Sequence, residues 1–457
     1  MKVTSQSWSR VRIAHFSGPN SHRGMTFRKQ IVALPIFIFF MALILRFSTA
    51  AIFLYGGVQT IDNANVTEGY EAVGIAHSLA SGKGFSAPWP GAGPTAWLTP
   101  VMPGLLALDM YIFGLHSRTT LIVFVIFNEI CSALTVFPVF SAARRIVGNQ
   151  GAGSIAAVGA WLWALNPTAG VAACRFIWYT TLSGLLGALL LWATLTVRDS
   201  EKRRAWIGYG LLWGAQLMTH PSFLVLMPIA LLWLAWPLRD SQRVRLAAVA
   251  CLTAVFCCVP WTIRNFVVFH HFVPLRSNFG FEFWRYNHGG IPSHPNHDPA
   301  ERDEFSSLGE YAYTHQKQNE ALVWISRHPR AFLHETARRI MHFWFDLAHP
   351  LRSFLHDGAW FFKLKLLYIC ALLLLVFAGL VTLWRKRREY FWLLASFPAL
   401  FPLVYYIALA RDFHRYPIDP ILAVIAALAV LQFPSGKSAF AFSPTTVTGT
   451  RRPNTLQ

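Results

Sequence analysis

Long apolar stretches alternate with short polar segments along most of this chain. The apolar stretches cover residues 31–55, 119–142, 153–168, 177–197, 205–219, 221–237, 246–263, 364–384, 390–410 and 417–433. Most approach the roughly 17 to 25 residues that a helix needs to cross a bilayer. They are continuous rather than alternating, and inside lipid such a stretch satisfies its backbone groups only as a helix. The pattern therefore predicts an all-α polytopic membrane protein with about ten transmembrane helices.

One further apolar stretch, residues 101–115, is shorter than the others. It opens with Pro100 and Pro103 and contains Asp109. Counting it as a crossing would also place the basic pair Arg144 and Arg145 on the outer side. We therefore expect a juxtamembrane helix that lies at the outer membrane surface.

The distribution of basic residues indicates how the chain is oriented in the membrane. The chain has 457 residues, 54% of them hydrophobic, and a formal net charge of +19. The Lys and Arg residues cluster between apolar stretches, at 144–145, 202–204, 239–245 and 385–388. Such clusters mark cytoplasmic loops, so they indicate orientation rather than a nucleic-acid partner. Both termini are then predicted inside, with two substantial outer segments, 56–118 and 264–362.

This topology predicts five regions. They are a basic cytoplasmic segment 1–30, a transmembrane bundle 31–263 that includes the outer loop 56–118, an outer segment 264–362, C-terminal transmembrane helices 363–433, and a disordered cytoplasmic tail 434–457. The polar N-terminal segment lacks the early apolar core of a cleavable signal peptide. We expect a multi-pass protein of the cytoplasmic (inner) membrane, with its site facing the periplasm or exterior.

The first outer segment contains three carboxylates, Asp62, Glu68 and Glu71. If residues 67–80 form a helix, Glu68 and Glu71 lie on one face. A carboxylate at a membrane surface suits a general base that deprotonates an acceptor. The simpler alternative is a set of solvated loop acids, although ionisable groups that face a membrane are frequently functional.

Basic residues of the predicted outer side could bind a phosphate group. These are Lys83, Arg175, Arg264, Arg276 and Arg285. Arginine binds phosphate oxygens in a bidentate manner, which suits a lipid-phosphate leaving group. For each residue alone, contact with lipid headgroups is the simpler alternative. Arg46 lies within the first apolar stretch, where it is costly unless it pairs or reaches the interface.

Histidines raise the question of a metal. His294 and His297 stand three residues apart, but no Cys or fixed carboxylate accompanies them. We therefore expect no cofactor and no metal site, with a divalent metal as the minor alternative. No nucleotide-phosphate loop is present.

Several motifs resemble those of a known superfamily. The run Glu71–Ala80 with Gly82–Ser86 is similar to the first outer loop of GT-C membrane glycosyltransferases. The following Gly93–Trp97, with Pro100, Pro103 and Phe113–Gly114, resembles the juxtamembrane segment of the same families. These include bacterial relatives of protein O-mannosyltransferases and aminoarabinose transferases. Residues 260–265, 274–282 and 415–418 resemble motifs of a bacterial branch of the same group.

The resemblance implies a GT-C fold and an inverting transfer of a sugar from a polyprenyl-phosphate-linked donor at the outer face. It implies a first-loop carboxylate as base, for which we favour Glu71, then Glu68, with Asp62 as the third candidate. It also assigns Glu282, Arg415 and Tyr416 to the substrate-binding set. One departure is Tyr179, at a position where relatives often have an acid.

Two other functions stay open at this level. A transporter or flippase of lipid-linked glycans would favour paired repeats and polar helices at the membrane midplane, whereas here the polar residues gather at one face. An O-antigen polymerase or ligase would share the lipid-linked substrate. The sequence leaves the sugar open, and the acceptor could be a protein, a lipid or a glycan.

Overall fold

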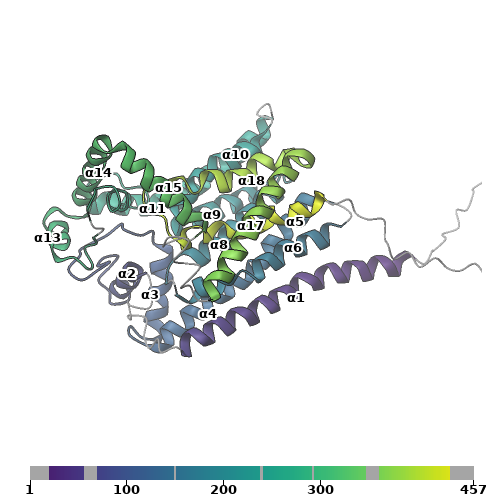
Figure 1. Cartoon of the computed structure of the whole chain (residues 1–457), viewed down its shortest axis with the longest axis horizontal. Coiled ribbons are helices and arrows are strands. Elements are labelled where there is room, and N and C mark those ends of the chain that lie inside the picture. Colours follow the sequence, from purple (N-terminus) through teal and green to yellow (C-terminus); the bar gives the residue numbers. More distant parts are fainter. Residues whose placement is uncertain are drawn as a thin grey trace, which may run out of the picture.

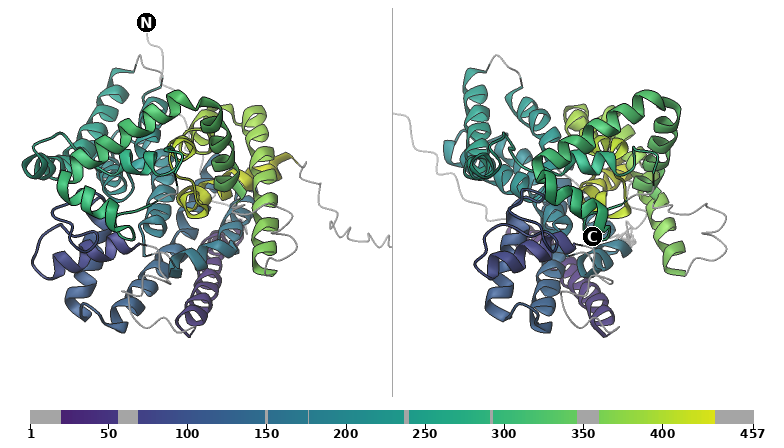
Figure 2. Two further views of the ribbon diagram at one scale, coloured as in Figure 1. Left: turned by 60° about the vertical axis from the view of Figure 1, so that its left-hand side comes forward. Right: turned by 90° about the vertical axis from the view of Figure 1, so that its left-hand side faces the viewer.

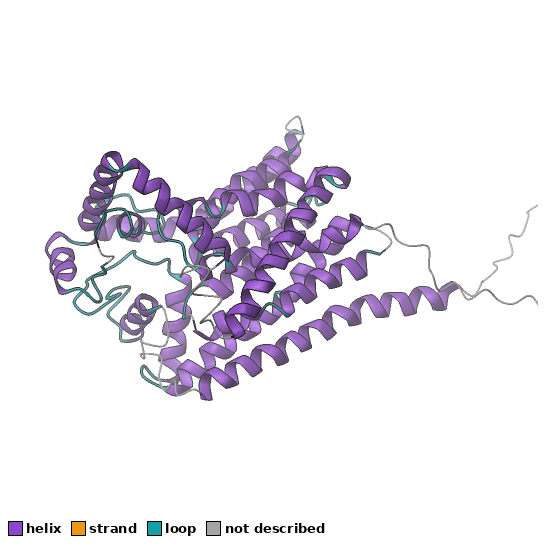
Figure 3. Cartoon of the chain, in the orientation of Figure 1, coloured by secondary structure: helices purple, strands orange, loops and turns teal. Residues whose placement is uncertain are grey.

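The computed structural model describes residues 20–55, 69–148, 151–175, 177–236, 240–290, 293–345 and 360–432, with side chains from residue 34 onward. Within these ranges the chain is helical and contains no strand; Ser86 and Pro94 form an isolated bridge (Figure 3). The predicted all-α membrane class is confirmed. The predicted segment 1–30 and tail 434–457 lie largely or wholly outside the described residues.

Six helical stretches in the described ranges are long and apolar enough to cross a membrane. They belong to α1 (Asn20–Tyr55), α4 with α5 (Arg118–Leu134, Val136–Val147), α8 (Thr180–Val197), α11 (Ser241–Phe269), α17 (Trp360–Lys386) and α18 with α19 (Arg388–Leu400, Leu403–Ile407). A bent pair, α6 (Ala152–Ala164) and α7 (Pro167–Arg175), would make a seventh. The chain is thus a multi-pass membrane protein, and the count of about ten spans stays a prediction.

Shorter helices fill the remaining predicted positions. These are α9 (Arg203–Thr219), η1 with α10 (Pro221–Leu226, Met227–Ala235), and the run η3, α20 and η4 (Tyr416–Ile418, Asp419–Ala427, Leu428–Gln432). The last run is too short to pass as a span by length, yet residues 416–429 are all buried. It packs against α5, α6, α8, α17 and α18, so it is the core of the bundle rather than a lipid-facing helix.

Two element boundaries differ from the sequence prediction. The expected span 153–168 breaks at Asn166, whose side chain accepts hydrogen bonds from the backbone and hydroxyl of Thr168 and so starts α7. The axis turns by 45° at this break. In addition, α11 continues to Phe269, past the predicted boundary at residue 263.

The basic clusters meet at one end of the bundle. Arg145 pairs with Asp199, and Arg387 donates to the carbonyl of Val147 at 2.5 Å. Arg198 lies 4.0 Å from the ring centroid of Trp233, whose indole donates to the carbonyl of Glu389 at 2.6 Å. Connections from four separate loops therefore share one surface, as the charge pattern predicts for a cytoplasmic side.

The opposite end is covered by a layer of shorter helices, on the left in Figure 1 and facing the viewer in the right panel of Figure 2. The layer consists of α2 (Tyr70–Ala80), α3 (Val101–Phe113), α12 (Phe279–Trp284), α13 (Pro299–Leu308), α14 (Glu310–Arg327) and α15 (Pro329–Phe345). The predicted juxtamembrane stretch is α3, which packs on α2. The short η2 (Asp412–His414) follows α19 and leads into η3.

Close helix contacts in the core depend on glycine. At Gly379 of α17, a methyl group would overlap the backbone carbonyl of Ile425 in α20. Gly208 of α9 is exposed, and nothing lies within 4 Å of a methyl group added there. We expect Gly379→Ala to lower the stability in detergent by about 1–3 kcal/mol, because α17 must move off the core helix.

The measurement is the melting temperature of the two purified variants. Gly208→Ala should leave it unchanged or raise it, since alanine there removes chain entropy from the unfolded state without a clash. An equal melting temperature for both variants would contradict the close packing of α17 on α20.

Candidate active site

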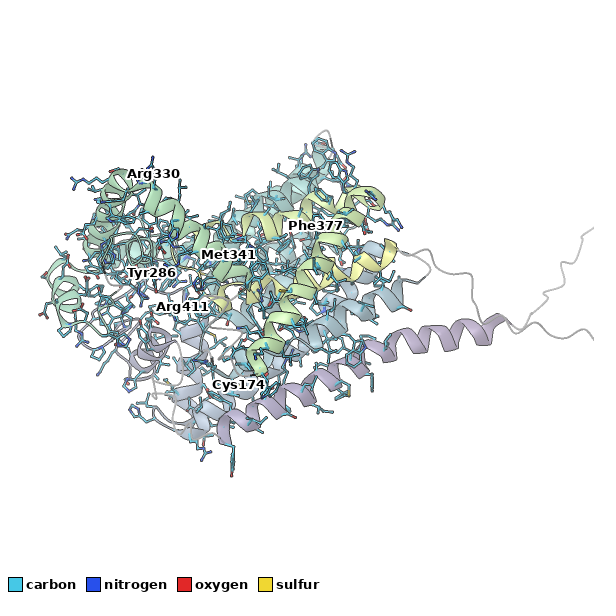
Figure 4. The ribbon with its side chains drawn as sticks, viewed as in Figure 1. Cys174, Tyr286, Arg330, Met341, Phe377 and Arg411 are labelled. Carbon is cyan, nitrogen blue, oxygen red and sulfur yellow. The ribbon has the colours of Figure 1, made fainter. Side chains whose placement is uncertain are left out.

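A cavity of about 770 Å³ lies where the outer layer meets the bundle. Its polar wall comes from α2, from residues 274–285 around α12, and from residues 411–414. Its apolar wall comes from η1 and from residues 400–409 around α19. Figure 4 labels Arg411, which lines this cavity on the side of the bundle. It also labels Tyr286, which lies in the neighbouring part of the outer layer. The volume falls in the range of roughly 300–1,000 Å³ typical of ligand sites.

Gly69 determines where α2 begins and therefore where Glu71 stands. Its φ of 123° is strained for other residues, and a side chain there would overlap the carbonyl of Ile177. Glu71 follows in the first turn of α2, where the helix dipole favours a negative charge. Its side chain lines the cavity and is only 4% exposed.

Burial alters the acidity of Glu71. Desolvation is the largest cause that raises the pKa of its carboxyl and nearby Glu282 also raises it, whereas a backbone hydrogen bond, Arg285 and Arg276 oppose the rise; together they place the pKa at about 7. Among the described residues, Oε2 of Glu71 has no hydrogen-bond partner. A buried carboxyl that gains and loses its proton near neutral pH is suited to general base catalysis.

His294 lies against Glu71. Its Nε2 is 3.7 Å from Oε1 of Glu71, and the imidazole is 2% exposed. Sequence reasoning considered this histidine only for a metal. Within the described part of the chain, no three His, Cys, Asp or Glu side chains gather as a metal group; the expectation of no metal or other cofactor stays a prediction.

Three of the predicted binding residues line the same cavity: Arg276, Glu282 and Arg285. Arg276 donates from Nε to the carbonyl of Trp97 at 2.9 Å and from Nη1 to the hydroxyl of Tyr179 at 3.3 Å. Arg285 lies 4.0 Å from Glu282, and its Nε has no hydrogen-bond partner among the described residues. The cavity thus places two carboxylates and two guanidinium groups at one end.

Arg264 and Lys83 lie elsewhere. The guanidinium of Arg264 donates to the carbonyls of Thr95 and Phe85 at 2.6 and 2.7 Å, so it fixes the first outer loop. Lys83 is exposed in the turn after α2. Neither residue lines the cavity.

Arg175, Arg415 and Tyr416 line a second cavity of about 310 Å³ between α7 and α17. Arg415 forms a buried ion pair with Asp419, 2.8 Å from Nε to Oδ1. Tyr416 is buried, with its hydroxyl 3.2 Å from that of Ser132. Phe413 lines both cavities. The remaining candidates, Asp62 and Glu68, lie outside the described residues.

The structure adds groups that sequence reasoning did not assign to the site. Tyr405 lines the cavity, and its hydroxyl lies 2.7 Å from Nε2 of His220 and 3.0 Å from Oγ of Ser222. Arg411 and His414 complete this wall. Two signals were available in the sequence: the break at His220 and Pro221, and the proximity of Arg411 to the motif at 415–418.

A buried carboxylate holds the outer segments together. Oε1 of Glu310 accepts from the backbone of Ala96 at 2.7 Å and from the hydroxyl of Ser277 at 2.6 Å, while Oε2 accepts from Thr95 at 2.5 Å. This residue connects α14 with the loop after α2 and with the approach to α12. The positions of Glu71 and Arg276 relative to one another therefore depend on it.

Residues 97–263 match the family model of dolichyl-phosphate-mannose-protein mannosyltransferases. The apo oligosaccharyltransferase of Archaeoglobus fulgidus is similar in structure, with a TM-score of 0.53 and 14% identity over 88% of this chain and 50% of that one. A search of curated proteins gives no match.

Two further solved structures also match this chain. The oligosaccharyltransferase AglB from Archaeoglobus fulgidus, in complex with an inhibitory peptide and a dolichol-phosphate, has a TM-score of 0.50 and 13% identity over 89% of this chain and 50% of that one. ArnT from Cupriavidus metallidurans, bound to undecaprenyl phosphate, has a TM-score of 0.36 and 14% identity over 89% of this chain and 78% of that one.

These similarities confirm the predicted resemblance to GT-C membrane glycosyltransferases at the level of the fold. The chain spans half the length of the oligosaccharyltransferases that it matches. The family match runs from α3 into α11, so Glu71 and the arginines after residue 263 lie outside it.

We expect Glu310→Gln to loosen the outer layer, because an amide nitrogen would face a donor where the carboxylate oxygens now accept three hydrogen bonds. Leaving such a buried group unsatisfied costs about 1–3 kcal/mol. Limited proteolysis in detergent should cut residues 270–345 faster than in the wild type. The control is Glu320→Gln, at a half-exposed site on the same helix; equal cleavage of both variants would contradict the role of Glu310.

Proposed function

We propose that this protein is an integral-membrane glycosyltransferase that moves a sugar from a polyprenyl-phosphate-linked donor to an acceptor at the outer face of the membrane. The observation that carries the proposal is Glu71, a buried carboxylate at the polar end of a cavity whose other wall is apolar. The GT-C fold supports the reaction class, and the dolichol-phosphate bound to AglB supports the donor class.

The shape of the cavity suits such a donor. Glu71, Arg276 and Arg285 would surround the sugar phosphate. Leu224, Val225 and Leu403 line the other wall and are 50%, 40% and 47% exposed, which in a bilayer means exposure to lipid chains. A prenyl chain could lie along this wall while its phosphate stays at the polar end, because apolar surface there costs nothing to keep in lipid.

The proposed chemistry is a single displacement. Glu71 takes the proton from the acceptor hydroxyl or amine, and the acceptor atom forms a bond to the anomeric carbon of the sugar. The bond between that carbon and the phosphate oxygen breaks, and polyprenyl phosphate leaves with the electron pair, so the anomeric configuration inverts. Arg276 and Arg285 stabilise the charge that develops on the phosphate.

The orientation follows from the basic clusters. They lie at the end of the bundle opposite to the cavity, and basic loops mark the cytoplasmic side. We infer that the cavity faces the periplasm or exterior of the inner membrane. The acceptor is then a protein, lipid or glycan on that side.

Glu71→Gln should abolish transfer while leaving donor binding, since the amide keeps the shape but accepts no proton. We expect a loss of about 10²–10⁴-fold in kcat. The measurement uses purified protein, radiolabelled undecaprenyl-phosphate sugars and membrane extract as the source of acceptor. Asp303→Asn, at an exposed site on α13, serves as the control.

The wild-type rate should also depend on pH. A base must be ionised, so the rate should rise with pH through the pKa of Glu71, about 7, and level off above it. Unchanged transfer by Glu71→Gln would remove this residue as the base. If the wild-type protein binds polyprenyl phosphate but consumes no donor, the result would favour lipid translocation instead of transfer.

Arg285→Ala should weaken binding of the donor phosphate. A charge-assisted hydrogen bond contributes about 1.5–3 kcal/mol, so the donor KM should rise roughly ten- to a hundredfold. The matched control is Arg330→Ala, an exposed arginine of α15 that Figure 4 labels at the top of the outer layer. If both variants keep the wild-type KM, Arg285 does not bind the donor.

A further inference from the structure

His294 occupies an aromatic enclosure beside the candidate base. Its ring centroid lies 5.2 Å from Trp89, 5.2 Å from Phe281 and 5.3 Å from Tyr70, all edge to face. The side chain is 2% exposed although it lies in an irregular segment between α12 and α13. An imidazole enclosed on so many sides has its orientation fixed by packing.

Hydrogen bonding fixes which nitrogen carries the proton. The backbone N–H of Asn296 lies 3.0 Å from Nδ1 of His294 and can only donate. Nδ1 must therefore accept, which leaves the proton of the neutral ring on Nε2. Desolvation, with smaller effects of Arg285 and His297, lowers the pKa of His294 to about 2, so the ring stays neutral throughout the physiological range.

An acceptor of opposite polarity lies close to the Nε2–H group. Oε1 of Glu71 is 3.7 Å away, beyond the roughly 2.7–3.2 Å of an ordinary hydrogen bond. Among the described residues, neither Nε2 of His294 nor Oε2 of Glu71 has a hydrogen-bond partner. A buried donor without a partner costs about 1–3 kcal/mol, so a small movement that brings Nε2 of His294 onto Oε1 of Glu71 is favourable, and Oε2 of Glu71 stays available to another partner.

We propose that His294 is the positioning residue of the site, a neutral Nε2–H donor that holds one oxygen of the Glu71 carboxylate and leaves the other for the acceptor. This role rests on the proposed transfer reaction, in which Glu71 is the base. A neutral donor stabilises the ionised carboxylate without adding a further charge beside it. Because the ring does not protonate, the proton taken by Glu71 stays on the carboxyl.

Other charged or titratable groups also face this pair. Tyr70 neighbours Glu71 on α2, Glu282 and Arg285 come from around α12, Arg276 precedes α12, and His297 follows His294. Their effects on Glu71 are common to the wild type and to variants of His294. A comparison that changes only residue 294 therefore isolates the contribution of its donor.

Two substitutions separate donation from packing. His294→Gln places an amide N–H near the position of Nε2, whereas His294→Leu fills similar space without a donor. Infrared spectroscopy follows the carboxyl C=O stretch of Glu71 with pH and assigns it by its absence in Glu71→Gln. Loss of the hydrogen bond should raise the midpoint of this titration by about one pH unit in His294→Leu, and His294→Gln should stay close to the wild type.

The rate profile gives a second readout. In His294→Leu the acid limb of kcat should move to higher pH by the same amount, with the donor KM little changed, and His294→Gln should restore it. His294→Leu is compared with His334→Leu, an exposed histidine on α15, for melting temperature. Identical midpoints and identical acid limbs in wild type, Leu and Gln variants would overturn the proposal and leave His294 a packing residue.

The two readouts separate this inference from the proposed function. The infrared titration needs no substrate, so a shift in His294→Leu together with no transfer by the wild type would keep the contact and reject the transferase. Transfer by the wild type with no infrared shift would keep the transferase and reject His294 as its positioning residue.

Discussion

The site depends on one buried carboxylate that performs no chemistry, that of Glu310. Its two oxygens accept hydrogen bonds from Thr95, Ala96 and Ser277. Desolvation raises the pKa of this carboxyl, and the three hydrogen bonds oppose the rise because they stabilise the ionised form. The surrounding groups are thus arranged as donors to a carboxylate. Through this contact the loop after α2 and the approach to α12 are held to α14. The walls that present Glu71 and Arg276 come from these same segments, so the geometry of the cavity follows from it.

Much of the architecture could be predicted from local patterns. Continuous apolar stretches predicted the helices, and the basic clusters predicted which loops share a surface. Glu71 could be chosen because the first outer segment contains few carboxylates and the family resemblance aligns with it. The break of the span at Asn166 was missed because a capping side chain outweighs the apolar pattern around it. The buried run at 416–429 was read as an ordinary span, since sequence alone does not tell a core helix from a lipid-facing one.

Which arginines line the cavity and which hold a loop in place could not be predicted from the sequence. Arg264 and Arg276 are twelve residues apart and equally suitable by composition, yet one fixes a loop through two carbonyls and the other lines the cavity. Their roles depend on which distant backbone groups lie opposite them, at Phe85, Thr95 and Trp97. The same holds for His294, which meets Glu71 across more than two hundred residues of chain. Tyr179, where relatives often have an acid, instead receives a hydrogen bond from Arg276.

Arg46 has a consequence for how the chain enters the membrane. It is 3% exposed within the first apolar stretch and donates to Ser132 and to the carbonyls of Trp163 and Asn166, beside the break between α6 and α7. An arginine at the centre of an isolated helix costs about 2.5–3.5 kcal/mol on insertion. These acceptors are synthesised 86 to 120 residues after Arg46. The first helix is therefore synthesised before these acceptors, and the buried contacts of Arg46 form only after α4, α6 and the break that precedes α7 have been synthesised.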